Sequence, residues 1–284
     1  MSLIQQALIR AAAQRKAQGA PDERSTAERL AAERPSAERA AAEAALAVAP
    51  LDRARFQRVS FDRQAMEKNC VMTAVPEDRA AVQAYKILRT RVRQRMAQKQ
   101  WRTVAVTGVT PGDGKTLTAV NLALAMAQDD DSWVYLVDLD LLRPAVAPTL
   151  GLRFERGLGD YLAGRCEVND LVCATEYERL AIVANTTAIA DSTEQLVSRR
   201  TLELVETLRA DTPHRTIIID MPPMLGTADV LAFAPHVDCV LAVVSEGQTS
   251  RDALASAREI LSETNLLGTV LNRSTEADSV SYDY

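Results

Sequence analysis

A loop in the first half of the chain contains residues with the types and spacing of a phosphate-binding site. Within VTGVTPGDGKTLTAVNLALAMA (residues 106–127), Gly114, Lys115 and Thr116 match the end of the pattern G-x-x-x-x-G-K-[ST]. Gly112 and Gly114 allow backbone positions whose N–H groups converge on phosphate oxygens. The lysine can reach the β- and γ-phosphates of a nucleotide, and the threonine hydroxyl can ligate Mg²⁺. This stretch therefore predicts a site for ATP and Mg²⁺.

Three positions distinguish this loop from a simple glycine-rich turn. Val109 stands where the pattern has its first glycine, and Pro111 and Asp113 lie inside the turn. We expect both inserted residues to be tolerated, because the glycines and the start of the next helix already supply phosphate-facing N–H groups. A chance match in a surface turn is the alternative. The apolar strand before the loop and the apolar helix after it favour a functional site.

Carboxylates follow two further apolar stretches. Asp138 and Asp140 close the stretch VYLVDLD, with Arg143 shortly after, and Asp220 closes RTIIID. Carboxylates at the end of a buried strand are costly unless a cation neutralises them, and Mg²⁺ bound to nucleotide phosphates would do so. Capping of a following helix is the alternative for Asp140. Asp229 either touches the same site or caps the next helix.

The elements that must position these residues alternate along the chain from about residue 78. We expect a basic amphipathic helix in EDRAAVQAYKILRTRVRQRMAQ, then near-continuous apolar strands separated by helices. Strands are expected at 103–107, 133–140, 180–184, 215–220, 239–245 and 268–272, helices at 115–128 and 250–263, and a further element at 201–210. This pattern predicts an α/β fold of the P-loop NTPase type, a mostly parallel sheet covered by helices on both faces. Ligands of such folds bind at the carboxyl ends of the strands, where the motifs above lie.

The segments that flank this regular part differ in composition. Residues 1–75 are rich in Ala, Arg and Glu, and we expect an N-terminal helix followed by a partly helical, mobile linker. Apolar residues share one face of the expected helix at 3–18, which indicates either a short solvated helix or one that docks on a membrane-bound partner. The P-loop domain is expected at 76–272 and a flexible tail at 273–284, where apolar periodicity ends.

Composition limits the classes of function. The chain has 284 residues and a formal net charge of −5, so its overall balance does not favour nucleic-acid binding. Its four cysteines and two histidines have no zinc-ligand spacing, and we expect reduced, structural cysteines. No apolar run reaches the ~18 residues of a membrane-spanning helix, and the N-terminus lacks the features of a secretory signal. We expect a cytoplasmic protein whose membrane association, if any, comes through a partner or a helix on the lipid surface.

The phosphate loop with Pro111, the D-x-D at the next strand end and the D-x-P-P at a later one together resemble the bacterial tyrosine kinases of capsule and exopolysaccharide synthesis, often called BY-kinases. The similarity runs from about Val82 to Asn272 and includes GLGDYLAG (157–164) and EQLVSRRTLELVETL (194–208). The resemblance implies an ATP-dependent protein-tyrosine autokinase that regulates polysaccharide polymerisation and export. The opening MSLIQQAL is also similar to the subgroup linked to exosortase-type exopolysaccharide loci.

This resemblance implies roles for individual residues. Lys115 and Thr116 would hold ATP·Mg²⁺, and Asp220 would order the water shell of the metal. Asp138 and Asp140 would serve as base and metal-associated carboxylates. The implied catalytic group is Lys115, Asp138, Asp140 and Asp220, and the implied metal ligands are Thr116, Asp140 and Asp220. The implied nucleotide contacts are Pro111, Gly112, Asp113, Gly114, Lys115, Thr116, Leu117, Arg143 and Asn272. The implied phosphate acceptors are the tail tyrosines Tyr282 and Tyr284.

The resemblance also implies partners. These are a transmembrane adaptor of the polysaccharide co-polymerase (Wzz-like) type at the inner face of the cytoplasmic membrane, a cognate tyrosine phosphatase, and further copies of the chain in a ring. The ring-forming helix of this family carries an E-x-x-R pattern. Here Gln83 and Lys86 replace the glutamate and the first arginine, whereas Arg89 is kept. We therefore expect a weaker ring, in which this helix packs between subunits through an apolar stripe that includes Ile87 and Val92.

Two other functions stay open on the sequence. A MinD/ParA-like ATPase switch has similar motifs, but it carries a second lysine early in its loop, where this chain has Thr110. A nucleotide-binding scaffold with weak catalysis would fit the tail, because its two tyrosines replace the longer cluster of the family. Pro111 and the D-x-P-P favour the kinase. Phosphotyrosine formation with ATP and Mg²⁺ separates the three functions.

Overall fold

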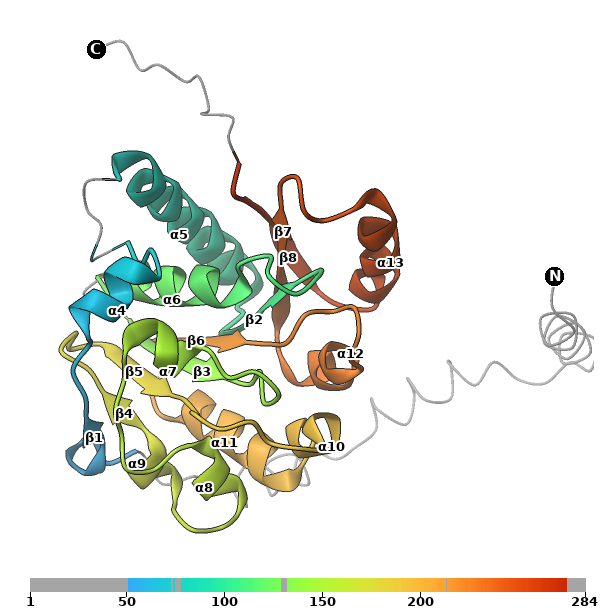
Figure 1. Ribbon diagram of the computed structural model, residues 1–284. Coiled ribbons are helices and arrows are strands. Elements are labelled where there is room, and N and C mark those ends of the chain that lie inside the picture. Colours follow the sequence, from blue (N-terminus) through green and yellow to red (C-terminus); the bar gives the residue numbers. More distant parts are fainter. Residues whose placement is uncertain (1–50, 73, 75–77, 129–131, 213, 275–284) are drawn as a thin grey trace, which may run out of the picture. The chain divides into compact units, whose positions relative to one another are not determined.

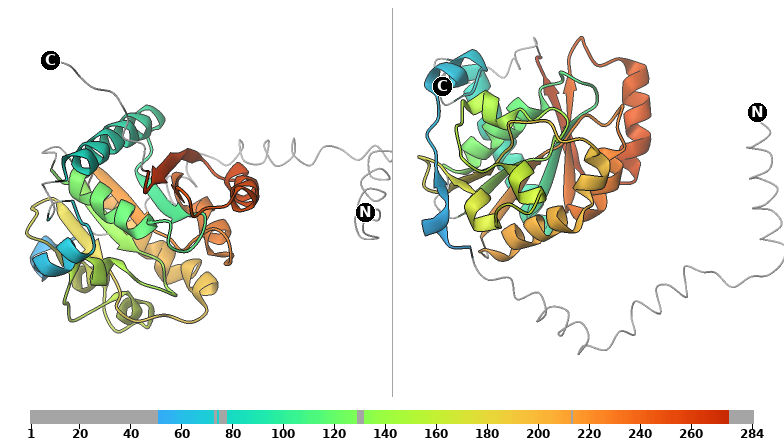
Figure 2. Two further views of the ribbon diagram at one scale, coloured as in Figure 1. Left: turned by 45° about the horizontal axis from the view of Figure 1, so that its top comes forward. Right: turned by 60° about the horizontal axis from the view of Figure 1, so that its bottom comes forward.

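The computed structural model describes residues 51–72, 74, 78–128, 132–212 and 214–274. The helix expected at 3–18 and the acceptor residues Tyr282 and Tyr284 lie outside these ranges. Within them, eight strands form one sheet, and helices cover it on both faces (Figures 1 and 2). This arrangement confirms the predicted α/β fold.

The sheet has the strand order β1-β4-β5-β3-β6-β2-β7-β8. Neighbouring strands run parallel except β4 and β5, which are antiparallel. Ile217, Ile218 and Ile219 are successive and all fully buried, because helices cover both faces of the central strands. The strands are β1 (Gln57–Arg58), β2 (Thr103–Gly108), β3 (Trp133–Asp138), β4 (Cys173–Ala174), β5 (Leu180–Val183), β6 (Arg215–Asp220), β7 (Cys239–Ser245) and β8 (Leu266–Asn272).

Two apolar clusters join the helices to the two faces of the sheet. One cluster contains buried residues of α4, α5, α6 and α7, and the other contains buried residues of the helices from α8 to α13. The α-helices are α4 (Arg63–Lys68), α5 (Arg79–Lys99), α6 (Lys115–Met126), α7 (Val146–Leu150), α8 (Leu158–Leu162), α9 (Val168–Leu171), α10 (Ser192–Leu196), α11 (Arg199–Ala210), α12 (Asp229–Phe233) and α13 (Arg251–Ser262). Short 3-10 helices occupy Arg53–Arg55 and Ala234–His236.

Residues 51–72 and 74 belong to the folded part of the chain, which corrects the linker expected up to residue 75. Strand β1 pairs with β4, and helix α4 begins after Asp62, whose carboxylate accepts the N–H groups of two following residues. Phe56, Met66 and Val71 are buried in the two apolar clusters. The sequence prediction was wrong here because these apolar residues are too few and too widely spaced to show a helical or strand period.

Most of the large apolar side chains of α5 pack against the core of the same chain. Val92 and Met96 are buried, and Leu88 packs partly against the same cluster, whereas Ile87 is exposed. The expectation of an apolar stripe available for contacts between subunits is therefore corrected. Val92 is buried in the core beneath α5, whereas Ile87 is exposed to solvent.

Candidate nucleotide-binding site

The predicted phosphate loop connects the end of β2 to the start of α6. Gly112 and Gly114 have positive φ angles of 89° and 91°, a conformation that L residues with a side chain rarely adopt. Gly114 is the N-cap of α6, so the loop leads directly into a helix N-terminus with its unpaired N–H groups. The glycines that the sequence singled out thus set the local backbone.

Asp113 braces this loop from inside. The residue is 1% exposed, and its carboxylate accepts hydrogen bonds from the Thr110 N–H at 2.7 Å and from the Thr110 hydroxyl at 3.0 Å. The Thr249 hydroxyl, after β7, donates to it at 2.9 Å, and the Asn272 amide donates to the Asp113 carbonyl at 2.9 Å. Asp113 and Asn272, expected as nucleotide contacts, therefore tie the loop to the ends of β7 and β8.

The Lys115 ammonium lies among carboxylates at or just beyond the ends of two strands, β3 and β6. Its Nζ is 2.7 Å from Asp140 Oδ2 and 3.4 Å from Asp220 Oδ1. The Thr116 hydroxyl donates to Asp220 Oδ2 at 2.6 Å. Burial acts to lower the pKa of Lys115, but the charges of Asp220 and Asp140 outweigh it and raise that pKa, so the lysine stays cationic.

Asp138 and Asp220 are register neighbours at the ends of β3 and β6. Asp138 Oδ2 accepts the N–H groups of Ala145 and Val146, each at 2.9 Å, and so holds the start of α7. Burial, together with the charge of Asp220, raises the pKa of Asp138 to about 8. Burial also raises the pKa of Asp220. The pair is costly to keep ionised without nearby positive charge.

The donor set fits a magnesium ion that completes its shell with phosphate oxygens. Asp138, Asp140 and Asp220 are all buried at this strand edge, and Lys115 forms ion pairs with Asp140 and Asp220. Within the described residues, no group of three or more His, Cys, Asp or Glu side chains forms a metal cage by itself. Mg²⁺ in nucleotide sites is commonly held by one or two carboxylates, waters and substrate phosphates. Thr116, Asp140 and Asp220 suit that kind of site.

Other predicted residues lie nearby with less specific contacts. The Arg143 N–H donates to Asp140 Oδ1 at 3.0 Å, and the side chain of Arg143 is exposed. Pro111 is exposed in the loop, and Leu117 packs partly against the core. Asp229 is fully buried and accepts the Ser192 hydroxyl at 3.0 Å, so it links α12 to α10.

The sequence reasoning missed two hydroxyls at this edge. The Thr249 hydroxyl donates to the Asp113 carboxylate from outside the loop, and it also accepts the Ser245 N–H at 2.9 Å. Thr107 donates to the Pro222 carbonyl at 2.6 Å and thereby fixes the turn after Asp220. A Ser or Thr placed one to four residues past a strand end is the signal that would have pointed to Thr249.

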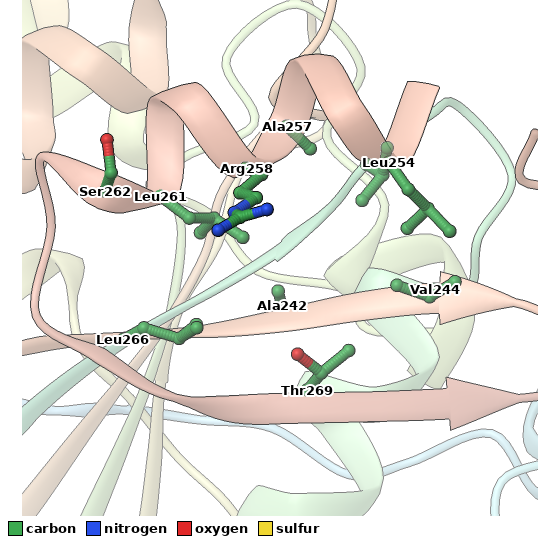
Figure 3. Close-up of a pocket in the computed structure, with 10 residues that line it drawn as sticks. Ala242, Val244, Leu254, Ala257, Arg258, Leu261, Ser262, Leu266 and Thr269 are labelled. Atoms are coloured by element: carbon green, nitrogen blue, oxygen red, sulfur yellow. The ribbon is translucent and has the colours of Figure 1, made fainter. Parts of the chain in front are cut away.

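An apolar pocket of about 300 Å³ lies elsewhere, between α13 and the strands β7 and β8 (Figure 3). Its lining includes Leu254, Leu261 and Leu266, and Arg258 is its charged residue. None of the carboxylates around Lys115 lines it. The nucleotide site is therefore defined by loop and strand ends rather than by this pocket.

Known proteins match most of the chain. Residues 101–276 match a family model described as an AAA domain. The tyrosine-protein kinase YwqD of Bacillus subtilis is 28% identical over 221 residues, which cover 77% of this chain and 92% of YwqD. The tyrosine-protein kinase Etk of Escherichia coli K12 is 29% identical over 221 residues, which cover 76% of this chain and 30% of Etk.

Solved structures show the same relation. The kinase domain of Escherichia coli Etk has a TM-score of 0.61 and 27% identity, covering 71% of this chain and 80% of that domain. The septum site-determining protein MinD of Pyrococcus horikoshii OT3, solved with Mg-ADP, has a TM-score of 0.51 and 21% identity, covering 62% of this chain and 72% of MinD. MinD thus shares the fold, whereas the kinase domain is similar in both sequence and fold.

Proposed function

This chain belongs to the AAA-domain P-loop proteins and, among them, to the bacterial tyrosine kinases, and we propose from that premise that it phosphorylates C-terminal tyrosines of a second copy of itself. In the reaction, a tyrosine oxygen forms a bond to the γ-phosphorus of ATP as the bond to the ADP oxygen breaks, and the tyrosine proton passes to a carboxylate. The polysaccharide-export role of the family is part of this proposal.

The convergence of Lys115, Thr116, Asp140 and Asp220 carries the proposal. The lysine comes from the phosphate loop and the aspartates follow two different strands, yet the Lys115 ammonium contacts both carboxylates. Lys115 would bind phosphate oxygens, and Thr116, Asp140 and Asp220 would hold the metal. Bound Mg²⁺ would spread the charge of the transferring phosphate.

Asp138 is our choice for the proton acceptor. It lies in the same strand edge as Asp140, but Asp140 already pairs with Lys115, whereas the contacts of Asp138 are with backbone N–H groups. Those donors hold its carboxylate in one orientation, which a general base requires. Fixed orientation of the carboxylate and the positive charge of Lys115 are what the protein itself contributes.

The proposed setting is the inner face of the cytoplasmic membrane, with a transmembrane adaptor of the polysaccharide co-polymerase type as partner and a tyrosine phosphatase that reverses the reaction. Within the described residues, the helices are too short or too polar to span a bilayer. An adaptor would therefore supply the anchorage that these helices do not.

Phosphotyrosine formation by the purified full-length protein tests the proposal. With ATP and Mg²⁺, the protein should become labelled on tyrosine, and chelation of Mg²⁺ should stop labelling. Lys115→Met should reduce the rate by ~100-fold or more, because a cation aimed at the phosphates is lost. Lys99→Met, at the exposed end of α5, is the matched control and should keep the wild-type rate.

Two outcomes would contradict the proposal. ATP hydrolysis without any phosphotyrosine would indicate an ATPase switch. Equal labelling of the Lys115→Met and Lys99→Met proteins would show that the label does not arise at this loop.

A further inference from the structure

A second charged pocket lies at the opposite edge of the sheet from Lys115. Arg102 precedes β2, Arg215 opens β6 and Asp238 precedes β7, so these residues gather at the amino ends of parallel strands. Together with Gln100, Glu206 and Arg209 they line a cavity of about 390 Å³. Three of these six side chains are arginines, which are always charged in proteins.

The two carboxylates of this pocket, Asp238 and Glu206, already accept hydrogen bonds from other groups. Asp238 Oδ2 accepts the backbone N–H groups of Arg102 at 2.7 Å and Thr103 at 2.8 Å. Glu206 is exposed and pairs with Arg209 at 3.0 Å along α11, and Arg209 also donates to the Thr103 hydroxyl at 2.9 Å. The two terminal nitrogens of Arg209 are thus paired with its neighbours, whereas its Nε is buried without a partner among the described residues, and both carboxylates of the pocket already have donors.

Arg102 and Arg215 lack such partners. In the part of the chain that the structure describes, neither guanidinium has a hydrogen bond or an ion pair, and the Arg215 Nε is buried without a partner. Burial lowers the pKa of Arg215, and the charge of Arg102 lowers it further. Asp211 acts in the opposite direction: its Oδ2 accepts the Tyr135 hydroxyl and the Arg53 guanidinium, each at 2.5 Å, and its Oδ1 is buried without a hydrogen-bond partner in the described part of the chain.

We propose that Arg102 and Arg215 form a binding site for the phosphate group of an anionic ligand, distinct from the ATP site. Guanidinium groups present paired N–H donors that match phosphate oxygens, and an anion here would relieve two like charges held close together. The cavity volume falls within the range of small-molecule sites. The phosphate group comes either from free inorganic phosphate or from a phosphotyrosine side chain.

Calorimetric titration of the full-length Lys115→Met protein tests this site, because that substitution weakens phosphate binding at the loop. Inorganic phosphate and O-phosphotyrosine are titrated separately, with ionic strength held constant by NaCl so that general screening does not change. We expect one saturable site. Arg215→Gln and Arg102→Gln should each weaken binding by ~10-fold or more, since each removes charged donors. Arg153→Gln, an exposed arginine outside the pocket, should leave affinity unchanged.

The two ligands distinguish the source of the phosphate. Tighter binding of O-phosphotyrosine identifies a tyrosyl ligand, and equal binding identifies free phosphate as sufficient. Absence of saturable binding by either ligand would overturn the proposal, as would equal affinity in the Arg102→Gln, Arg215→Gln and Arg153→Gln proteins. Circular dichroism verifies that each variant is folded, and Arg102→Gln, at an exposed position, keeps the test valid if Arg215→Gln unfolds. None of these measurements depends on kinase activity, so failure of the proposed kinase function would not affect the result.

Discussion

Gly114 is constrained by both its backbone angle and its neighbour. Its φ is 91°, and a Cβ built on it would overlap the side-chain amide of Asn272. We predict that Gly114→Ala lowers the free energy of unfolding by ~1–3 kcal/mol and weakens ATP binding, because the residue is strained and the loop must shift. Urea unfolding and nucleotide titration measure the two effects.

Gly112 supplies the matched control for this prediction. Its φ is 89°, but a Cβ there meets nothing within 4 Å, so Gly112→Ala tests the angle without the overlap. Removing the overlap by Asn272→Ala should recover part of the loss in Gly114→Ala and none in Gly112→Ala. Equal losses in both glycine variants, with no recovery, would show that Asn272 does not restrict Gly114.

Asp238 provides a pH-dependent test away from the nucleotide site. Burial opposes its ionisation, but the N–H groups of Arg102 and Thr103 outweigh this and hold the pKa of Asp238 below its usual value. A depressed folded pKa stabilises the protein above the unfolded pKa, and that stability is lost as pH falls through the folded value. Asp238→Asn should therefore destabilise the protein at neutral pH.

The difference between Asp238→Asn and the wild type should shrink once pH falls below the usual carboxyl range, near pH 4. Urea unfolding of both proteins at several pH values measures it. A difference that is constant from neutral to acid pH would show that the ionised carboxylate is not what stabilises this strand edge.

Sequence reasoning found the groups that carry charge at the nucleotide site but not those that brace it. Lys115, Asp138 and Asp220 were predictable because each follows an apolar strand, and parallel strands bring their carboxyl ends together. The burial of the Asp113 carboxylate inside the loop was not predictable, because its hydrogen-bond partner Thr249 is 136 residues away in sequence. Such a contact depends on the packed positions of β2 and β7 rather than on any local pattern.

At the scale of elements, the segment from residue 51 to 74 should be required for the fold. Removing residues 1–48 leaves every described element intact, whereas removing residues 1–75 deletes β1 and α4. The longer deletion exposes the sites that Phe56, Met66 and Val71 fill, each worth ~1.5–3 kcal/mol of burial. We expect the shorter protein to unfold cooperatively near the wild-type urea midpoint and the longer deletion to be strongly destabilised.

Equal urea midpoints for the two deletions would mean that this segment does not contribute to the stability of the sheet.

The strands and long helices were predictable because their apolar runs bury both sides of a central sheet. The segment at 51–74 was not, because Phe56 and Met66 contribute to opposite apolar clusters and leave no period in the sequence.

At the scale of the whole molecule, phosphorylation in trans requires a tail that reaches a second copy. Residues 273–284 span at most ~40 Å when extended. The proposed catalytic residues and the proposed acceptor tyrosines lie in separate parts of the sequence, so they can be inactivated independently. We predict that a Lys115→Met protein with an intact tail becomes labelled when it is mixed with a catalytically competent protein in which Tyr282 and Tyr284 are both Phe.

Neither protein should label strongly alone, because one lacks the cation of its phosphate loop and the other lacks the acceptors. In the mixture, a size tag on the Lys115→Met protein should place the phosphotyrosine on that chain, and peptide mapping should place it at Tyr282 and Tyr284. Each phosphate adds about −1.5 to −2 charges near the buried aspartates of the neighbouring site, which favours departure of the tail after transfer. An unlabelled mixture would contradict transfer between copies. Label on Tyr85, Tyr161 or Tyr177 would contradict the tail as acceptor while leaving the kinase reaction intact.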